Sequence, residues 1–320
     1  MYVRSQSDDI YGDVWTEEKA YCVEVEVHRV QDAEDLLFSP WREVSWTEKK
    51  REELRENLTL YKPSFEALSK VRVLLLGPVG AGKSSFINSI RSVLYRRVSL
   101  LPIIGSVSEG FTKKLKCYDI RAEKGGQPTA LTLCDAMGFG DSEGTGMTLH
   151  DTLAVIKGHV PEGHKFQSEA SINFNTPGYR QSPAMEDTVH CAVFVLDACK
   201  VLSYSENLEK KLKKLHRMIS DLGIPHVVLL THVDQVCHAV QEDVQYVYTS
   251  RIVQERMQKA AELVGLPLSF VYPIKNYASE VSVNCNTDIL LLSAVNQILQ
   301  AIDDASEDYP SAPQEAETKR

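Results

Sequence analysis

The sequence predicts an α/β protein whose mostly parallel β-sheet is covered by helices on both faces. Apolar runs typical of buried strands alternate along the chain with segments in which apolar residues recur at helical spacing. Three of these runs, ending near residues 76, 135 and 231, lead directly into glycine-rich or polar residues. Because alternating strands and helices form parallel sheets that bind ligands at the carboxyl ends of their strands, we expect a ligand site where these three runs end.

Ahead of the first of these runs, the chain predicts one strand and one helix. Residues 21–28 alternate apolar and polar side chains, which is typical of a strand, but no partner strand is near in the sequence. Residues 47–60 predict a helix with Thr47 as its N-cap and with Leu54 and Leu58 on one side. A lone strand cannot bury its apolar face, so it must pair with the main domain, with another chain, or with nothing. These elements are too few to form a domain of their own, so the region is expected to be an extension of the main domain.

A glycine-rich turn follows the apolar run at residues 71–76 and precedes a helical pattern. The spacing Gly77-x4-Gly82-Lys83-Ser84 is that of a phosphate loop, in which backbone N–H groups surround the β-phosphate of a nucleotide. Lys83 supplies positive charge, Ser84 a hydroxyl for Mg²⁺, and the helix turns its positive N-terminal end toward the phosphates. The alternative is a turn that matches the pattern by chance, and a strand before and a helix after argue against it. The predicted contacts are Gly77, Val79, Gly80, Ala81, Gly82, Lys83, Ser84 and Ser85.

The polar segment from Ser99 to Lys114 is typical of a nucleotide-dependent switch loop. In such loops a serine or threonine meets Mg²⁺ and the γ-phosphate, so that the loop is ordered only in the triphosphate state. Thr112 is the candidate switch residue and Mg²⁺ ligand. A surface loop without ligand contact is the alternative. A strand is predicted directly after it, at residues 115–120.

The second apolar run, residues 130–134, delivers Asp135 at its carboxyl end, and Gly138 follows. In an Asp-x-x-Gly motif of this kind, Asp135 holds a Mg²⁺-bound water and the Gly138 N–H senses the γ-phosphate. Phe139 stands where Ras-like enzymes have a water-orienting Gln, and a phenyl ring cannot hydrogen-bond water. Intrinsic hydrolysis is therefore expected to be slow, unless Asp141, a hydroxyl of the connection that follows, or a second chain places the water.

The connection at residues 140–188 is unusually long, and connections of this length are usually functional or disordered. A short helix is predicted within it at residues 149–156. His159 and His164 lie five residues apart, but no carboxylate or thiolate pattern accompanies them. Histidines of a solvated loop are therefore favoured over a metal site.

A continuous apolar run at residues 189–198 predicts a buried strand, and residues 205–222 predict an amphipathic helix. The helix carries one apolar stripe, formed by Leu208, Leu212, Leu215, Ile219 and Leu222. Its basic residues could contact an acidic partner, but a solvated helix face is favoured. They are Lys210, Lys211, Lys213, Lys214 and Arg217.

The third apolar run, residues 225–230, leads into Thr231-His-Val-Asp234, in the place of the Asn-Lys-x-Asp base-reading motif. A carboxylate at Asp234 can accept both the N1–H and the N2–H₂ of guanine, and adenine offers no such pair of donors. Hydrogen bonds to a charged group contribute about 1.5–3 kcal/mol each, enough to discriminate between the bases. His232 replaces the usual lysine, whose stem covers the base, and its imidazole would stack instead. Thr231, His232 and Asp234 are thus predicted base contacts, with a preference for guanine.

Three further elements complete the alternation. A helix is predicted at about residues 243–264, a strand at 268–274 and a last helix at 288–302. The chain beyond is acidic and contains prolines, which is typical of a disordered tail. The predicted organisation is an N-terminal extension at 1–70, a P-loop NTPase G domain at 71–304 and a tail at 305–320.

The net charge, the cysteines and the absence of targeting motifs predict which partners and which compartment fit this sequence. The net charge of −9 over 320 residues and a pI near 5.5 argue against direct binding to nucleic acid, which needs concentrated positive charge. Seven cysteines, without a Cys-x-x-Cys pair, predict mostly buried thiols in a reducing compartment rather than a disulfide framework. There is no signal core, transmembrane-length run or lipidation motif, so the expected location is cytoplasmic.

These motifs also make the chain resemble the interferon-induced protein 44 family. The resemblance covers roughly residues 39–309 and is carried by residues 40–48, 77–88, 134–138, 190–198 and 230–234. It implies a cytosolic, interferon-inducible G-domain protein with a role in antiviral defence. It also implies a TLDc domain ahead of the G domain, but here only residues 23–27 resemble the end of one.

The functional expectation is a protein that binds GTP and GDP with Mg²⁺ and acts as a slow GTPase switch in an interferon-induced antiviral response. The alternative is a non-hydrolysing scaffold whose interaction surface is stabilised by bound nucleotide, and a protein partner or self-association would fit either role. Phe139 favours the scaffold, and the set of Lys83, Ser84 and Asp135 favours the switch. An ATP-using P-loop enzyme is disfavoured by Asp234.

Overall fold

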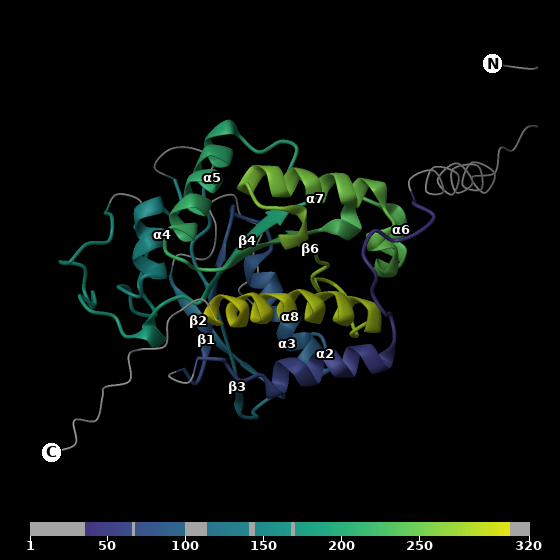
Figure 1. Cartoon of the computed structure of the whole chain (residues 1–320), viewed down its shortest axis with the longest axis horizontal. Helices are drawn as coiled ribbons and strands as arrows, with labels where there is room; N and C mark the ends of the chain where they lie inside the picture. Colours follow the sequence, from purple (N-terminus) through teal and green to yellow (C-terminus); the bar gives the residue numbers. More distant parts are fainter. Residues whose placement is uncertain (1–35, 66–67, 100–113, 141–144, 168–169, 308–320) are drawn as a thin grey trace, which may run out of the picture.

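The computed structural model describes residues 36–65, 68–99, 114–140, 145–167 and 170–307. Its centre is a six-stranded sheet with strand order β2-β3-β1-β4-β5-β6 (Figure 1). Only β2 runs antiparallel to its neighbour. The strands are β1 Val71–Leu76, β2 Lys116–Arg121, β3 Pro128–Asp135, β4 Cys191–Asp197, β5 His226–Thr231 and β6 Val271–Pro273.

Helices cover both faces of this sheet, and the alternation of side chains along β1 explains how. Leu74 and Leu76 face one apolar core, shared with α4, α5 and α7, whereas Val73 and Leu75 face a second, shared with α2, α3 and α8 (Figure 1). The predicted α/β class, a mostly parallel sheet covered on both faces, is therefore confirmed. The helices are α2 Glu48–Leu60, α3 Lys83–Tyr95, α4 Leu149–Ile156, α5 Glu206–Ser220, α6 His238–Glu242, α7 Arg251–Val264 and α8 Cys285–Glu307.

The helix before the sheet forms as predicted. The Thr47 side chain caps α2 by accepting a hydrogen bond from Lys50 N, and Leu54 and Leu58 are buried in the core that contains α8. α2 lies beside α8 (Figure 1). The strand predicted at residues 21–28 lies outside the described residues.

Three predicted elements near the C-terminus are wrong in their bounds. The helix predicted at 243–264 is interrupted, because Asp243 and Ser250 both cap new turns: a 3₁₀ turn at Val244–Tyr248, and α7. Their side chains bond to backbone N–H groups that a continuous helix would need for its own ladder.

The strand predicted at 268–274 begins instead with a 3₁₀ turn at Leu268–Phe270, which leaves only β6 to pair with β5. The last helix starts before its predicted residue 288, since Asn284 accepts hydrogen bonds from the first N–H groups of α8. It continues to Glu307, beyond its predicted end at residue 302.

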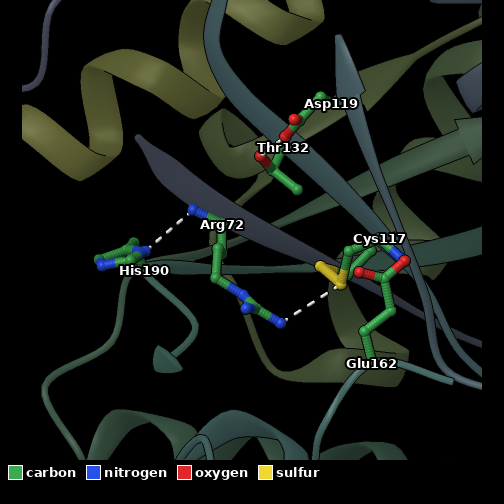
Figure 2. Close-up of a disulfide and its surroundings, with 7 residues drawn as sticks. Arg72, Cys117, Asp119, Thr132, Glu162 and His190 are labelled. Carbon is green, nitrogen blue, oxygen red and sulfur yellow. Dashed lines mark hydrogen bonds between the residues drawn. A yellow bond between two sulfur atoms is a disulfide. The ribbon is translucent and has the colours of Figure 1, made fainter. Parts of the chain in front are cut away.

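The prediction of mostly buried thiols rather than disulfides does not hold for one pair of cysteines. Cys117 and Cys134 form a disulfide between β2 and β3, where the strand register places them opposite each other (Figure 2). Arg72 Nη2 donates a hydrogen bond to Cys117 Sγ at 3.3 Å, and Glu162 Oε1 accepts one from Cys117 N at 3.2 Å. Cys191 and Cys237 are buried free thiols, and Cys199 is an exposed one.

Within its described residues the long connection is ordered around α4 and a 3₁₀ turn at Met185–Asp187. His159 and His164 are half-buried rather than solvated, because His159 stacks on Tyr179 and His164 packs edge-on against Phe166. Among the described residues, no group of three or more histidine, cysteine or carboxylate side chains is placed to hold a metal ion. Within the same part of the chain, no helix is long and apolar enough to cross a membrane.

Candidate nucleotide-binding site

The predicted phosphate loop connects the carboxyl end of β1 to the first turn of α3. Gly77 is required by packing, because a Cβ there would lie 2.1 Å from Val195 O. Gly80 and Gly82 have φ angles of +78° and +90°, in the left-handed region that favours glycine. α3 begins at Lys83, so its N-terminal N–H groups open onto this loop.

Lys83 lies buried inside the loop, with 7% of its surface exposed. Its ammonium donates hydrogen bonds to Gly77 O at 3.0 Å and Pro78 O at 2.8 Å. Burial lowers the pKa of Lys83 to about 8, although the charge of Asp135 opposes the shift. The phosphate loop therefore surrounds the Lys83 ammonium, at the place where a bound phosphate would contact it.

Ser84 and Asp135 come together from the start of α3 and the end of β3. Ser84 Oγ donates a hydrogen bond to Asp135 Oδ2 at 2.5 Å, and the carboxyl group is buried. A hydroxyl and a carboxylate are the oxygen ligands that Mg²⁺ takes alongside nucleotide phosphates and water. These two residues therefore fit a Mg²⁺ ion. Asp135 follows Cys134 of the disulfide directly.

The Asp-x-x-Gly segment is hydrogen-bonded to the phosphate loop. Phe139 N donates to Gly77 O at 2.9 Å, and Val79 N donates to Phe139 O at 3.2 Å. Gly138 allows this close approach, because a Cβ there would lie 2.9 Å from Val79 N. Any movement of this segment must therefore break hydrogen bonds to the loop.

The Phe139 side chain points into the core rather than into the site. Its ring is 1% exposed, and Lys211 Nζ lies 5.4 Å from the ring centroid. Lys211, predicted to belong to a solvated face of α5, is thus half-buried. Along the same helix, Lys210 forms an exposed ion pair with Glu206, and Lys213 a partly buried one with Glu209. Phe139, which stands where Ras-like enzymes have a water-orienting Gln, is therefore buried in the core.

The base motif is also tied to the phosphate loop. Thr231 Oγ1 lies within hydrogen-bonding distance of Ala81 O, at 2.9 Å, and of Leu196 O, at 3.0 Å. His232 has a φ of +58°, and half-buried Asp234 lies in the 3₁₀ turn at Val233–Gln235. The motif therefore begins at the carboxyl end of β5, next to the loop, as expected for a base site.

Two further side chains reach this site that were not assigned to it from the sequence. Asp197, at the end of β4, is 5% exposed and lies 3.3 Å from His232 Nδ1. Burial raises the pKa of Asp197, but hydrogen bonds from His232 and from Cys199 N outweigh it and hold the pKa below its ordinary value. Asn276, which follows β6, donates from Nδ2 to Gly82 O at 3.3 Å. Both follow apolar strand runs, the same signal that marked the three recognised motifs.

The structure brings most of the predicted site residues to one edge of the sheet. The residues lie at or directly after the carboxyl ends of β1, β3 and β5; they are the loop residues from Gly77 to Ser85, together with Asp135, Gly138, Thr231, His232 and Asp234. Thr112 and Asp141 lie outside the described residues. The candidate site is therefore described without its predicted switch loop.

Three features define a P-loop NTPase of the G-domain class. They are a phosphate loop after the central strand β1, an aspartate at the end of the adjacent β3, and a base motif after β5.

No family model matches the sequence. Curated proteins do match it. Human interferon-induced protein 44-like is 33% identical over 288 residues, which cover 90% of this chain and 64% of that protein.

Mouse interferon-induced protein 44 is 36% identical over 257 residues, covering 80% of this chain and 60% of the mouse protein. Human interferon-induced protein 44 is 33% identical over 285 residues, covering 89% and 63%. The chain is thus similar to interferon-induced protein 44 and its 44-like relative, as its motifs predicted. It spans about three fifths of the length of these curated relatives.

Solved structures with a similar arrangement include a probable GTP-binding protein, engB. It shares 16% identity and a TM-score of 0.40, over 73% of this chain and 100% of that chain. A complex of SsGBP with GDP shares 13% identity and a TM-score of 0.34, over 90% of this chain and 62% of that one. The fold class rests on the strand order and the loop geometry rather than on these low scores.

Proposed function

We propose that this protein binds GTP and GDP together with Mg²⁺ at the edge of the sheet formed by β1, β3 and β5. The observation that supports it most is the buried Lys83 ammonium, which is surrounded by carbonyl oxygens of the phosphate loop. A buried cation is costly unless it meets negative charge, and nucleotide phosphates would supply that charge.

Mg²⁺ would be held by Ser84 and, through water, by Asp135, and it would neutralise negative charge on the β- and γ-phosphates. The hydrogen bond between Ser84 and Asp135 orients both side chains toward this shared role. Thr112 remains the proposed switch ligand from the loop that precedes β2.

The base would be read by Asp234, whose carboxylate can accept two guanine N–H donors. Thr231 supports this site because it joins the start of the base motif to the phosphate loop at Ala81. A nucleotide would thus be held at its phosphates and at its base by segments that are already in contact. Selectivity for guanine over adenine follows from the paired donors that adenine lacks.

Hydrolysis is proposed to be slow, because the buried Phe139 cannot position a water molecule. The same observation supports the second candidate, a scaffold that holds nucleotide without turning it over. The names of the relatives support induction by interferon. We propose with it a role in antiviral defence, in the cytoplasm. Induction of the transcript by interferon, and virus yield in cells that lack the protein, test that role.

Calorimetric titration with unmodified GDP, GTP, ADP and ATP tests the binding proposal. Lys83→Ala should weaken GDP binding by about 10- to 150-fold for each charge-assisted hydrogen bond that it removes. The matched control is Lys210→Ala, which removes an exposed lysine paired with Glu206 on α5 and should bind normally. Equal affinity for ATP and GTP would overturn the base assignment. Unchanged binding by a folded Lys83→Ala variant would overturn the phosphate site.

A further inference from the structure

The base motif lacks its lysine, and the residue in that position is already engaged by the protein. His232 Nδ1 lies 2.9 Å from Thr231 Oγ1 and 3.3 Å from Asp197 Oδ1. Its backbone is in the left-handed region, which fixes where the ring can reach. An imidazole held in this way is less free to cover a base than the long stem of a lysine.

A different lysine lies beside the phosphate loop. Lys200 belongs to the turn after β4, and its Nζ would lie 3.7 Å from a Cβ placed on Gly80. Gly80 is the middle glycine of the phosphate loop, so this ammonium lies close to the loop backbone. The lysine therefore approaches the site from β4, the strand that lies between β1 and β5.

The turn holds Lys200 in this position. Its backbone N–H donates to Asp197 O at 2.9 Å, and its carbonyl accepts from Ser203 N at 2.8 Å. Its ammonium lies 3.7 Å from Asp197 Oδ2, the same carboxylate that contacts His232. The Asp197 carboxylate thus contacts both Lys200 and His232 beside the phosphate loop.

Two other lysines near the site already have partners within the protein. Lys83 donates to carbonyls inside the loop, and Lys275, which precedes Asn276, lies 3.6 Å from Glu280. The Lys200 side chain is 55% exposed, so it is available to a ligand and contributes little to the core.

We propose that Lys200 supplies the lysine that the base motif lacks, with its ammonium against the phosphate loop at Gly80 and its aliphatic stem over the face of the bound guanine. This inference rests on the proposed nucleotide binding and adds a specificity-determining residue to it. Lysine suits the role because its stem packs on apolar surfaces while the charge stays in water, and because an ammonium is attracted to an aromatic face. In this arrangement the lysine that covers the base comes from the turn after β4 and not from the base motif after β5.

The test compares affinities for unmodified GDP and for a non-hydrolysable GTP analogue by calorimetry. Lys200→Ala should weaken both by about tenfold, the change that corresponds to about 1.4 kcal/mol of cation–π and packing energy. The loss should be equal for the two nucleotides, because the contact is to the base and the loop rather than to the γ-phosphate. Lys200→Arg should retain part of the affinity, since a guanidinium also stacks on aromatic faces.

Lys210→Ala serves as the control for the loss of an exposed lysine, and the thermal unfolding of nucleotide-free Lys200→Ala should match that of the wild type. Affinity of Lys200→Ala within twofold of wild type would overturn the inference while leaving the proposed function intact. A loss confined to the triphosphate would overturn it as well, as would a larger loss from His232→Ala than from Lys200→Ala. A wild-type protein that binds no guanine nucleotide would refute the proposed function, and this inference with it.

Discussion

Removal of the disulfide between β2 and β3 should lower the free energy of unfolding by about 3 kcal/mol. Cys117 and Cys134 are 17 positions apart, and closing a loop of this length restricts the unfolded chain by about that amount. β2 is an edge strand, so β3 is its only neighbour in the described sheet. The suitable change is Cys117→Ala, because Cys117 is half-buried whereas Cys134 is completely buried.

Urea unfolding, followed by intrinsic fluorescence with and without a reducing agent, measures this effect. The oxidised wild type should exceed Cys117→Ala by about 3 kcal/mol, and the reducing agent should abolish most of the difference. Cys199→Ala, which removes an exposed free thiol, should change stability by less than about 0.5 kcal/mol. The reasoning is refuted if Cys117 of the native, unreduced protein reacts with an alkylating agent, or if reduction leaves the unfolding midpoint unchanged.

Two further predictions concern pH and turnover. Burial raises the pKa of Asp288 to about 6 from 3.8, so its neutral form contributes stability that is full below pH 4 and is lost as the pH rises through 6. Asp288→Asn, measured by urea unfolding, should therefore gain up to about 3 kcal/mol on the wild type between pH 4 and 7, and a relative loss over that range would contradict the sign. GTP turnover should be slow, and its specific activity should rise with protein concentration if a second chain supplies the water-positioning group, or stay near background at every concentration if the protein is a scaffold. Fast turnover by a dilute monomer would contradict both versions.

Sequence patterns correctly predicted the elements that depend on residues close together in the chain. The phosphate loop, the strand that ends at Asp135 and the Thr47-capped helix each follow from a few neighbouring residues, and the structure has them at those positions. The continuous helix predicted from residue 243 failed because the apolar spacing continues across Ser250, while the Ser250 side chain competes for the backbone N–H of Val253.

Features that depend on distant parts of the chain could not be predicted in this way. The cysteine pair is formed by the register between two strands, and no spacing motif encodes that register. The approaches of Asn276 to Gly82 and of Lys200 to Gly80 likewise depend on how strands order themselves in the sheet. The rule that ligands gather at the carboxyl ends of parallel strands would have marked both as candidates.

The packing of α2 on α8 has a practical consequence for making fragments of this protein. A fragment that begins at β1 would lose Leu54 and Leu58 from the core and would leave the apolar flank of α8 open to water. It would also leave Asn296 Nδ2 without the Leu54 carbonyl and Asp303 without the Tyr61 hydroxyl. Such a fragment would be prone to aggregate during expression, so a recombinant G domain should start ahead of the α2 cap rather than at the first strand.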